Sequence, residues 1–384
     1  MSVISLRDLH RAVAVWLVCT SCTLAAGSSF TIPAPSISAR SFILLEFDSG
    51  RVLAEKSADE RVEPASITKI MTIYVVGHAL AEGHIRLEDE VVVSEKAWRM
   101  EGSRMFIEVG KRVTVDALID GVIVQSGNDA SVALAEHVSG SEESFALVMN
   151  DYAAKLGMAN SSFANATGLP DPNTYVTARD ITVLSSALIR EFPDLYRRFA
   201  KKEFTYNEIR QPNRNRMLFR NEGADGIKTG HTEAAGYCLV SSAVRDDMRL
   251  IAAVMGTDSD RARTESSSAL LRHGFRYFEA RRLYQAGNTI LTGKVWRGAS
   301  DALNVGVIDH ADIIFPRGRY DKLKATASLN DPLMAPITRG DVVGMVKVEL
   351  DGEIVSEFDL VALDDVVEGS FTSRMWDDLM MLFE

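Results

Sequence analysis

Ser66 and Lys69 are the two residues whose types and spacing most readily do chemistry together. They lie in Pro64–Thr72, where a turn-forming proline leads into an apolar run of helical character. Positions i and i+3 of a helix share one face, so the hydroxyl and the amine can approach each other. A desolvated amine can act as a base near neutral pH, and a helix N-terminus favours an oxyanion. The pair predicts a serine nucleophile for acyl transfer, although an N-cap serine on an ordinary helix has the same pattern.

Two further short motifs follow along the chain. Ser126–Asn128, with the sequence Ser-Gly-Asn, breaks two helical patterns at 114–124 and 129–137, and a plain turn has the same composition. Lys228–Gly230, with the sequence Lys-Thr-Gly, precedes an apolar strand pattern at 236–243. We expect it at or near a sheet edge, where glycine lets a ligand backbone approach closely. Any one of these motifs could occur by chance, but all three in this order, each on a suitable element, form a strong signal.

The segments around these motifs have the patterns of regular secondary structure. The run from Ile70 to Val76 is apolar on all sides, which predicts a buried helix that carries Ser66 at its root. Segments 41–47 and 51–55 predict a hairpin, and Asp48–Gly50 is its turn. A helix over 264–279 is expected to close this first domain.

The composition argues against several other kinds of function. The chain has 384 residues and a net charge of −11, so there is no electrostatic case for binding nucleic acid. Its histidines are scattered, and none has metal-ligand spacing with a second histidine or a cysteine. There is also no phosphate-binding loop. We therefore expect no metal and no cofactor.

The N-terminus predicts export. Arg7 and Arg11 precede a short apolar run and a small-residue zone, as in a secretory signal over residues 1–29. Cleavage there leaves Cys238 as the single cysteine, so the mature chain forms no internal disulfide. The expected location is the periplasm or the outer face of the cytoplasmic membrane.

The sequence pattern changes in the C-terminal third of the chain. Short β-rich runs alternate with turns over 283–366 and predict a small all-β sandwich domain without catalytic groups. Segment 369–384 predicts an amphipathic helix whose apolar residues, from Phe371 to Phe383, recur every four positions. Two roles follow equally from this pattern: peripheral contact with a membrane through 371–384, or packing on the β domain or a partner.

Taken together, these features resemble the D-alanyl-D-alanine carboxypeptidases, the low-molecular-mass penicillin-binding proteins of serine peptidase type. The resemblance also includes Asp225–Thr232 followed by Ala234–Tyr237, with Asn213–Asn215 upstream and Met255–Gly256 downstream. It covers essentially the whole mature chain. It implies an α+β fold: a transpeptidase/β-lactamase-like catalytic domain at 38–280, an antiparallel sheet with a helical region, then the β domain.

The resemblance also implies catalytic roles. Ser66 would attack the carbonyl between two D-alanines at the end of a peptidoglycan stem peptide, and Lys69 would accept its proton. Ser126 would relay a proton to the leaving amine, and Asn128 would hydrogen-bond a substrate amide. Lys228 would add positive charge and hydrogen-bond Ser126. β-Lactam antibiotics would be covalent inhibitors that acylate the same serine.

The remaining site residues would bind substrate. Thr229, with Arg214 nearby, would receive the terminal carboxylate. Gly230, the last residue of the Lys-Thr-Gly motif, would also lie against the substrate. The oxyanion hole would be the backbone N–H groups of Ser66 and His231.

Three alternatives remain open at this point. A serine β-lactamase shares two motifs, but it needs a glutamate that activates water, and no convincing candidate lies between Asn128 and Lys228. A DD-endopeptidase of the same superfamily would cut cross-links. A non-catalytic scaffold would have no need of intact Ser66 and Lys69.

Overall fold

The computed structural model describes residues 32–220 and 223–382. The expected secretory segment, residues 1–29, and the last two residues of the predicted tail helix lie outside the described residues.

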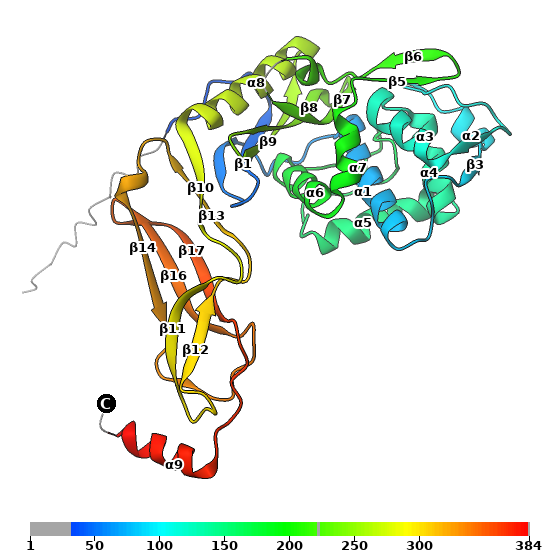
Figure 1. Ribbon diagram of the computed structural model, residues 1–384. Helices are drawn as coiled ribbons and strands as arrows, with labels where there is room; N and C mark the ends of the chain where they lie inside the picture. Colours follow the sequence, from blue (N-terminus) through cyan, green and yellow to red (C-terminus); the bar gives the residue numbers. More distant parts are fainter. Residues whose placement is uncertain (1–31, 221–222, 383–384) are drawn as a thin grey trace, which may run out of the picture. The chain divides into compact units, whose positions relative to one another are not determined.

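The N-terminal domain is built on a five-stranded antiparallel sheet with strand order β2-β1-β9-β8-β7 (Figure 1). Its strands are β1 (Ser41–Glu46), β2 (Val52–Lys56), β7 (Ala224–Thr232), β8 (Gly236–Arg245) and β9 (Met248–Thr257). The predicted hairpin is confirmed as β1 and β2, and β7 is an edge strand, as expected for Lys228–Gly230.

Both faces of this sheet are covered by helices. Alternate residues of a strand point to opposite faces. Accordingly Ile251 and Ala253 of β9 belong to one buried cluster with helices α1 and α6, whereas Leu250 and Ala252 belong to another with α8. The helices and helical turns of the domain are η1 (Ala65–Thr68), α1 (Lys69–Ala81), α2 (Glu95–Trp98), α3 (Val115–Asp120), η2 (Gly121–Gln125), α4 (Asn128–Ser139), α5 (Glu142–Lys155), α6 (Ala178–Glu191), α7 (Pro193–Tyr196), η3 (Arg197–Ala200), η4 (Arg216–Phe219) and α8 (Asp260–Tyr277).

Two short hairpins complete the domain, and several helix boundaries differ from the predicted ones. The hairpins are β3 (Glu90–Val92) with β4 (Arg112–Thr114), and β5 (Glu203–Tyr206) with β6 (Ile209–Pro212). The helix predicted over 114–124 is confirmed, with Thr114 as its cap, but its second half is the π-helical turn η2 rather than α-helix. The helix predicted over 264–279 begins earlier, at the Ser259 cap, and ends at Tyr277 because the chain becomes extended there.

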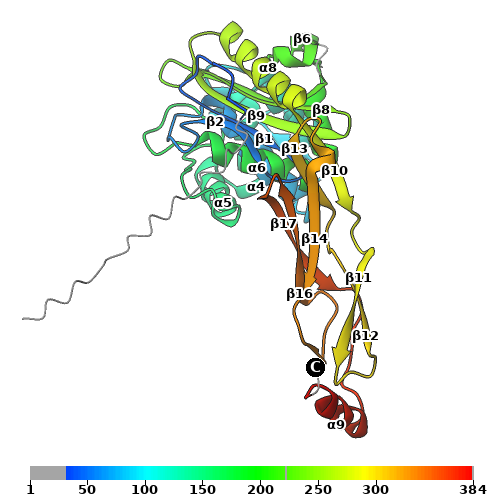
Figure 2. The same cartoon turned by 90° about the vertical axis from the view of Figure 1, so that its left-hand side faces the viewer.

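The C-terminal domain is all-β, as predicted (Figure 2). A six-stranded sheet has the order β14-β16-β17-β12-β11-β15, and β10 pairs with β13 in a separate ribbon. Ile313 and Phe315 of the ribbon share a buried cluster with Val346 and Val348 of the larger sheet. The elements are β10 (Phe278–Tyr284), β11 (Thr289–Trp296), β12 (Ala302–Gly306), β13 (Ala311–Pro316), η5 (Tyr320–Lys322), β14 (Leu323–Leu329), β15 (Leu333–Met334), β16 (Val342–Leu350), β17 (Glu353–Ala362) and the tail helix α9 (Phe371–Met380).

Candidate active site

Ser66 and Lys69 meet at the start of α1. Ser66 lies in the 3₁₀ turn η1, and Lys69 is the first residue of α1, so the hydroxyl lies just before the α-helix. Lys69 Nζ lies 3.1 Å from Ser66 Oγ, which agrees with the spacing argument. The Lys69 side chain is fully buried, and burial lowers its pKa to about 7, with the Arg214 charge as the next cause. The amine can therefore be neutral near physiological pH and take a proton from Ser66.

The Ser-Gly-Asn motif comes to the same point from another part of the chain. Ser126 has a left-handed backbone, with φ of 64°, at the end of η2, and Asn128 opens α4. Asn128 Oδ1 accepts a hydrogen bond from Lys69 at 2.7 Å, and its Nδ2 donates to the carbonyl of Glu101 at 2.6 Å. Both ends of this amide thus have protein partners, so a substrate amide would have to share them.

The Lys-Thr-Gly strand forms the third side. Lys228 is buried, and its Nζ donates to Ser126 Oγ and to the carbonyl of Thr229, both at 3.0 Å. Burial, followed by the nearby positive charges of Lys69 and Arg214, holds the pKa of Lys228 well below its ordinary value. A bound carboxylate would offset this accumulation of positive charge.

Gly230 packs closely against the segment that carries Ser66. A Cβ at this position would lie 2.8 Å from the carbonyl oxygen of Pro64 and 3.1 Å from the Ile67 side chain. Gly230 therefore also allows the close approach of the chain's own segment at the start of η1. Neighbouring His231 is exposed, and its ring lies 3.9 Å from the ring of Tyr237.

Two supporting residues were missed by the sequence reading. The Asp129 carboxylate accepts from the backbone N–H groups of Met105, Phe106 and Ile107, which fixes the loop beside Asn128. Buried Arg263 of α8 donates to the carbonyl of Gly230 at 2.9 Å and so braces β7. Neither residue stands in a motif: Asp129 resembles an ordinary first-turn acid, and Arg263 one more helix arginine.

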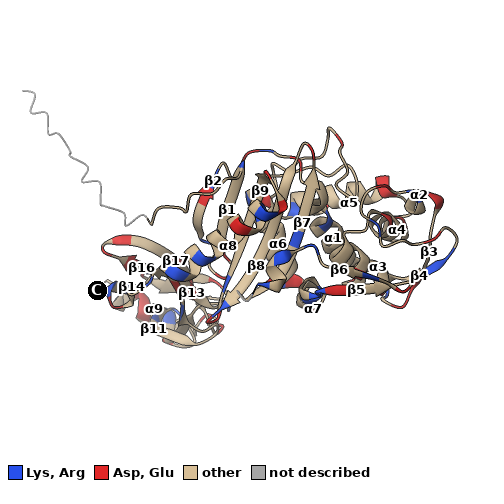
Figure 3. Cartoon of the chain, turned by 90° about the horizontal axis from the view of Figure 1, so that it is seen from above, with Lys and Arg blue, Asp and Glu red and all other residues tan. Residues whose placement is uncertain are grey.

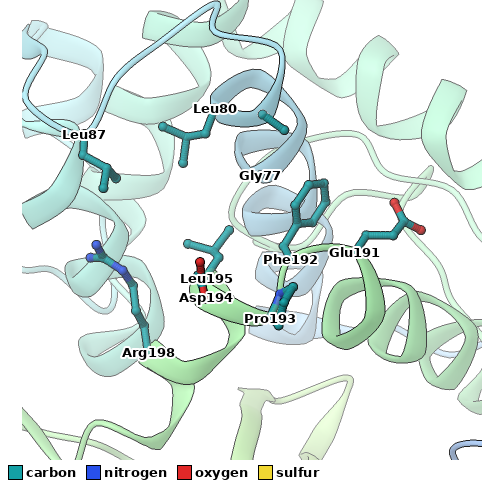
Figure 4. Close-up of a pocket in the computed structure, with 10 residues that line it drawn as sticks. Gly77, Leu80, Leu87, Glu191, Phe192, Pro193, Asp194, Leu195 and Arg198 are labelled. Carbon is teal, nitrogen blue, oxygen red and sulfur yellow. The ribbon is translucent and has the colours of Figure 1, made fainter.

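A pocket of about 340 Å³ lies between the end of α1 and α7 and is lined by none of the motif residues (Figure 4). Arg198 on its rim is an ion-pair partner of Asp116 and donates to Asp120 at 3.1 Å. Lys201 reaches the other oxygen of Asp120 at 2.5 Å. Because Asp120 ends α3 directly before η2, these contacts brace the turn that carries Ser126.

The distribution of charged residues, metal-ligand clusters and the cysteine thiol are the remaining features to compare with the site. Acidic and basic residues are interspersed over the elements (Figure 3). Over residues 32–220 and 223–382, no three His, Cys, Asp or Glu side chains gather as metal ligands would. Within that same part of the chain, the cysteine at 238 is buried, and burial raises its pKa to about 11, so it is a protonated thiol at neutral pH.

Comparison with known proteins agrees with this arrangement. The family model for D-alanyl-D-alanine carboxypeptidase matches residues 28–259, and that for the penicillin-binding protein 5 C-terminal domain matches 278–368. The chain is 45% identical to the D-alanyl-D-alanine carboxypeptidase DacC of Escherichia coli over 381 residues, 94% of this chain and 95% of that one. It is 40% identical to DacA of the same organism, covering 100% of this chain and 98% of the other.

A solved structure supports the same assignment. Penicillin-binding protein 5 from Haemophilus influenzae superposes with a TM-score of 0.85 at 40% identity, covering 88% of this chain and 100% of that one. The fold class and the resemblance drawn from the sequence are thereby confirmed. The chain belongs to the D-alanyl-D-alanine carboxypeptidase family of serine peptidases.

Proposed function

We propose that this protein removes the terminal D-alanine from peptidoglycan stem pentapeptides through an acyl-enzyme on Ser66, and that β-lactams acylate the same residue. One observation carries the proposal: a buried, neutralisable Lys69 lies 3.1 Å from the Ser66 hydroxyl. Lys69 takes the Ser66 proton as Oγ attacks the carbonyl carbon. The C–N bond then breaks, and the proton taken up by Lys69 is relayed through Ser126 to the leaving amine. Water releases the acyl group.

The remaining site residues are assigned to substrate. Lys228 and Thr229 receive the terminal carboxylate, with Arg214 close enough for its charge to lower the pKa of Lys69. The backbone N–H groups of Ser66 and His231 form the oxyanion hole. The β-lactamase, endopeptidase and scaffold alternatives gain no support from the relatives found.

The decisive experiment combines two reactions of the mature protein. It is incubated with a pentapeptide that ends in D-Ala-D-Ala, and released D-alanine is assayed. In parallel, a penicillin reaction is followed by intact mass. We expect D-alanine release together with a slowly hydrolysed adduct. Fast penicillin turnover without D-alanine release would favour a β-lactamase, and an adduct without release would favour cross-link cleavage.

Replacing Lys228 with methionine tests the carboxylate role. We expect kcat/KM for a peptide with a free terminal carboxylate to fall about 10- to 100-fold, the effect of one charge-assisted hydrogen bond. An analogue with an amidated terminus should lose much less. Exposed Arg216, which pairs with Asp260, supplies the control variant Arg216→Met. Equal losses on both peptides would remove the proposed role.

The tail helix supports peripheral membrane contact. Phe371 and Trp376 are 71% and 64% exposed, whereas Asp377 and Asp378 bind the backbone and guanidinium of Arg297. The apolar face is thus left uncovered while the acidic groups are occupied. Among the helices of the described residues, none is both long and apolar enough to cross a membrane.

Deleting 371–384 should release the protein from phospholipid vesicles without changing its activity on a soluble peptide. The double variant Phe371→Ser, Trp376→Ser should do the same, because apolar area drives the contact. Arg374→Ala, which changes the polar face, is the control and should stay bound. Cosedimentation with neutral vesicles measures both, and unchanged partitioning of the deletion variant would contradict membrane contact.

A further inference from the structure

The turn Asn165–Gly168 makes the shortest contact with the proposed base. Lys69 Nζ donates to the carbonyl oxygen of Thr167 at 2.6 Å. Asn165 Oδ1 accepts from the N–H groups of Thr167 and Gly168 and from the Thr167 hydroxyl, so the carbonyl has a fixed direction. A Cβ on Gly168 would lie 1.8 Å from the carbonyl oxygen of Ala65. The turn therefore packs directly against the residue before the nucleophile.

Ala166, at the centre of this turn, ties it to two other elements. Its carbonyl accepts from the Thr72 hydroxyl of α1 at 2.7 Å. Its N–H donates to Glu142 Oε1 at 3.1 Å. The carboxylate of Glu142 is nearly buried, and its other oxygen lies 3.0 Å from Lys96 Nζ. Glu142 thus uses both oxygens, and one of them fixes the turn that faces Lys69.

In the sequence, Glu142 looks like a helix-capping accessory. It follows the Ser141 cap of α5, where acidic residues are favoured by the helix dipole. Its neighbour Glu143 stands in the same first turn and also contacts Lys96, but its side chain is exposed. Over residues 32–220 and 223–382, Glu143 makes no hydrogen bond to the turn at 165–168. Both glutamates can stabilise the N-terminus of α5, but only Glu142 contacts the turn that faces Lys69. Comparing variants of the two therefore distinguishes an effect on the helix from an effect on Lys69.

We propose that Glu142 is a positioning residue for the general base: it fixes the Asn165–Gly168 turn, and through Thr167 it holds Lys69 against Ser66. The inference rests on the proposed function, in which Lys69 takes the Ser66 proton. Glu142 does not touch the reacting atoms. Its absence would let the Thr167 carbonyl move, and a misplacement of the base by about 1 Å can cost about 100-fold in rate.

The charge of Glu142 also reaches Lys69. Four charged groups face this amine: Arg214 lowers its pKa, Asp129 and Glu142 raise it, and Lys228 is a neighbouring amine whose own pKa it lowers. Removing the Glu142 charge should therefore lower the Lys69 pKa. The neutral amine would then persist to lower pH, and the acid limb of the rate profile would move the same way.

Three variants test the inference: Glu142→Ala, Glu142→Gln and Glu143→Ala. The glutamine keeps an oxygen that can accept from Ala166 N–H but loses the charge. The rate of penicillin acylation is measured from about pH 5 to about pH 9, the range that spans the expected Lys69 titration. D-Alanine release is measured alongside, and thermal melting checks that each variant is folded.

We expect Glu142→Ala to acylate about 10- to 100-fold more slowly, while Glu143→Ala stays within about twofold of the unchanged protein. Glu142→Gln should recover most of the rate at high pH, with its acid limb at lower pH. Equal rates for the two alanine variants would overturn the inference. If Glu142→Ala does not fold, the test uses Glu142→Gln. An acid limb of its acylation-rate profile at the same pH as in the unchanged protein would then overturn the inference. Failure of the unchanged protein to form any adduct would instead overturn the proposed function, and this inference with it.

Discussion

Ser66→Ala is expected to abolish both D-alanine release and covalent labelling by penicillin. Without the Oγ atom there is no nucleophile at the start of α1, and loss of a catalytic serine in comparable enzymes costs on the order of 10⁶-fold. Intact mass after penicillin treatment measures the adduct directly. The folded state should be intact, because Ser66 Oγ has Lys69 as its side-chain partner and is only partly buried.

Peptide mapping of the labelled protein supplies the control for this result. The adduct on the unchanged chain should lie on the peptide that contains Ser66. Labelling that survives in Ser66→Ala would place the nucleophile elsewhere, with Ser126 as the next hydroxyl to test because Lys228 donates to it.

The acylation rate should rise with pH through about pH 7, because burial lowers the pKa of Lys69 to about 7 and only the neutral amine accepts the serine proton. Lys69→Arg should lose about 10²- to 10⁴-fold at every pH, since a guanidinium stays protonated. The rate of labelling by a fluorescent penicillin, followed against pH, measures both effects. Exposed Lys155, paired with Asp151, gives the control Lys155→Arg.

The sign of a neighbouring charge gives an independent check. Arg214 lowers the Lys69 pKa, so Arg214→Met should raise that pKa and move the acid limb of the profile to higher pH. This is opposite to the shift expected for Glu142→Gln. A rate that is flat with pH in the unchanged protein would show that another group controls the proton transfer.

The sequence by itself determined the local features of this protein. The spacing of Ser66 and Lys69 and the hairpin turn at Asp48–Gly50 depend on neighbours close in the chain. Helical period and turn chemistry are short-range properties, and they act before tertiary contacts form. The α+β fold and the all-β second domain followed from these patterns together with the family resemblance.

Only the tertiary structure decided how the base is held. The partners of Lys69 beyond Ser66 come from Asn128 and Thr167, 59 and 98 positions along the chain. No local pattern records such contacts, and one of them is a backbone carbonyl, which every residue possesses. The same holds for Glu142, whose place beside the turn at 165–168 arises from packing between α5 and the loop. The close contact of Gly230 with Pro64, 166 positions away, is likewise a product of the tertiary fold, because β7 packs onto η1.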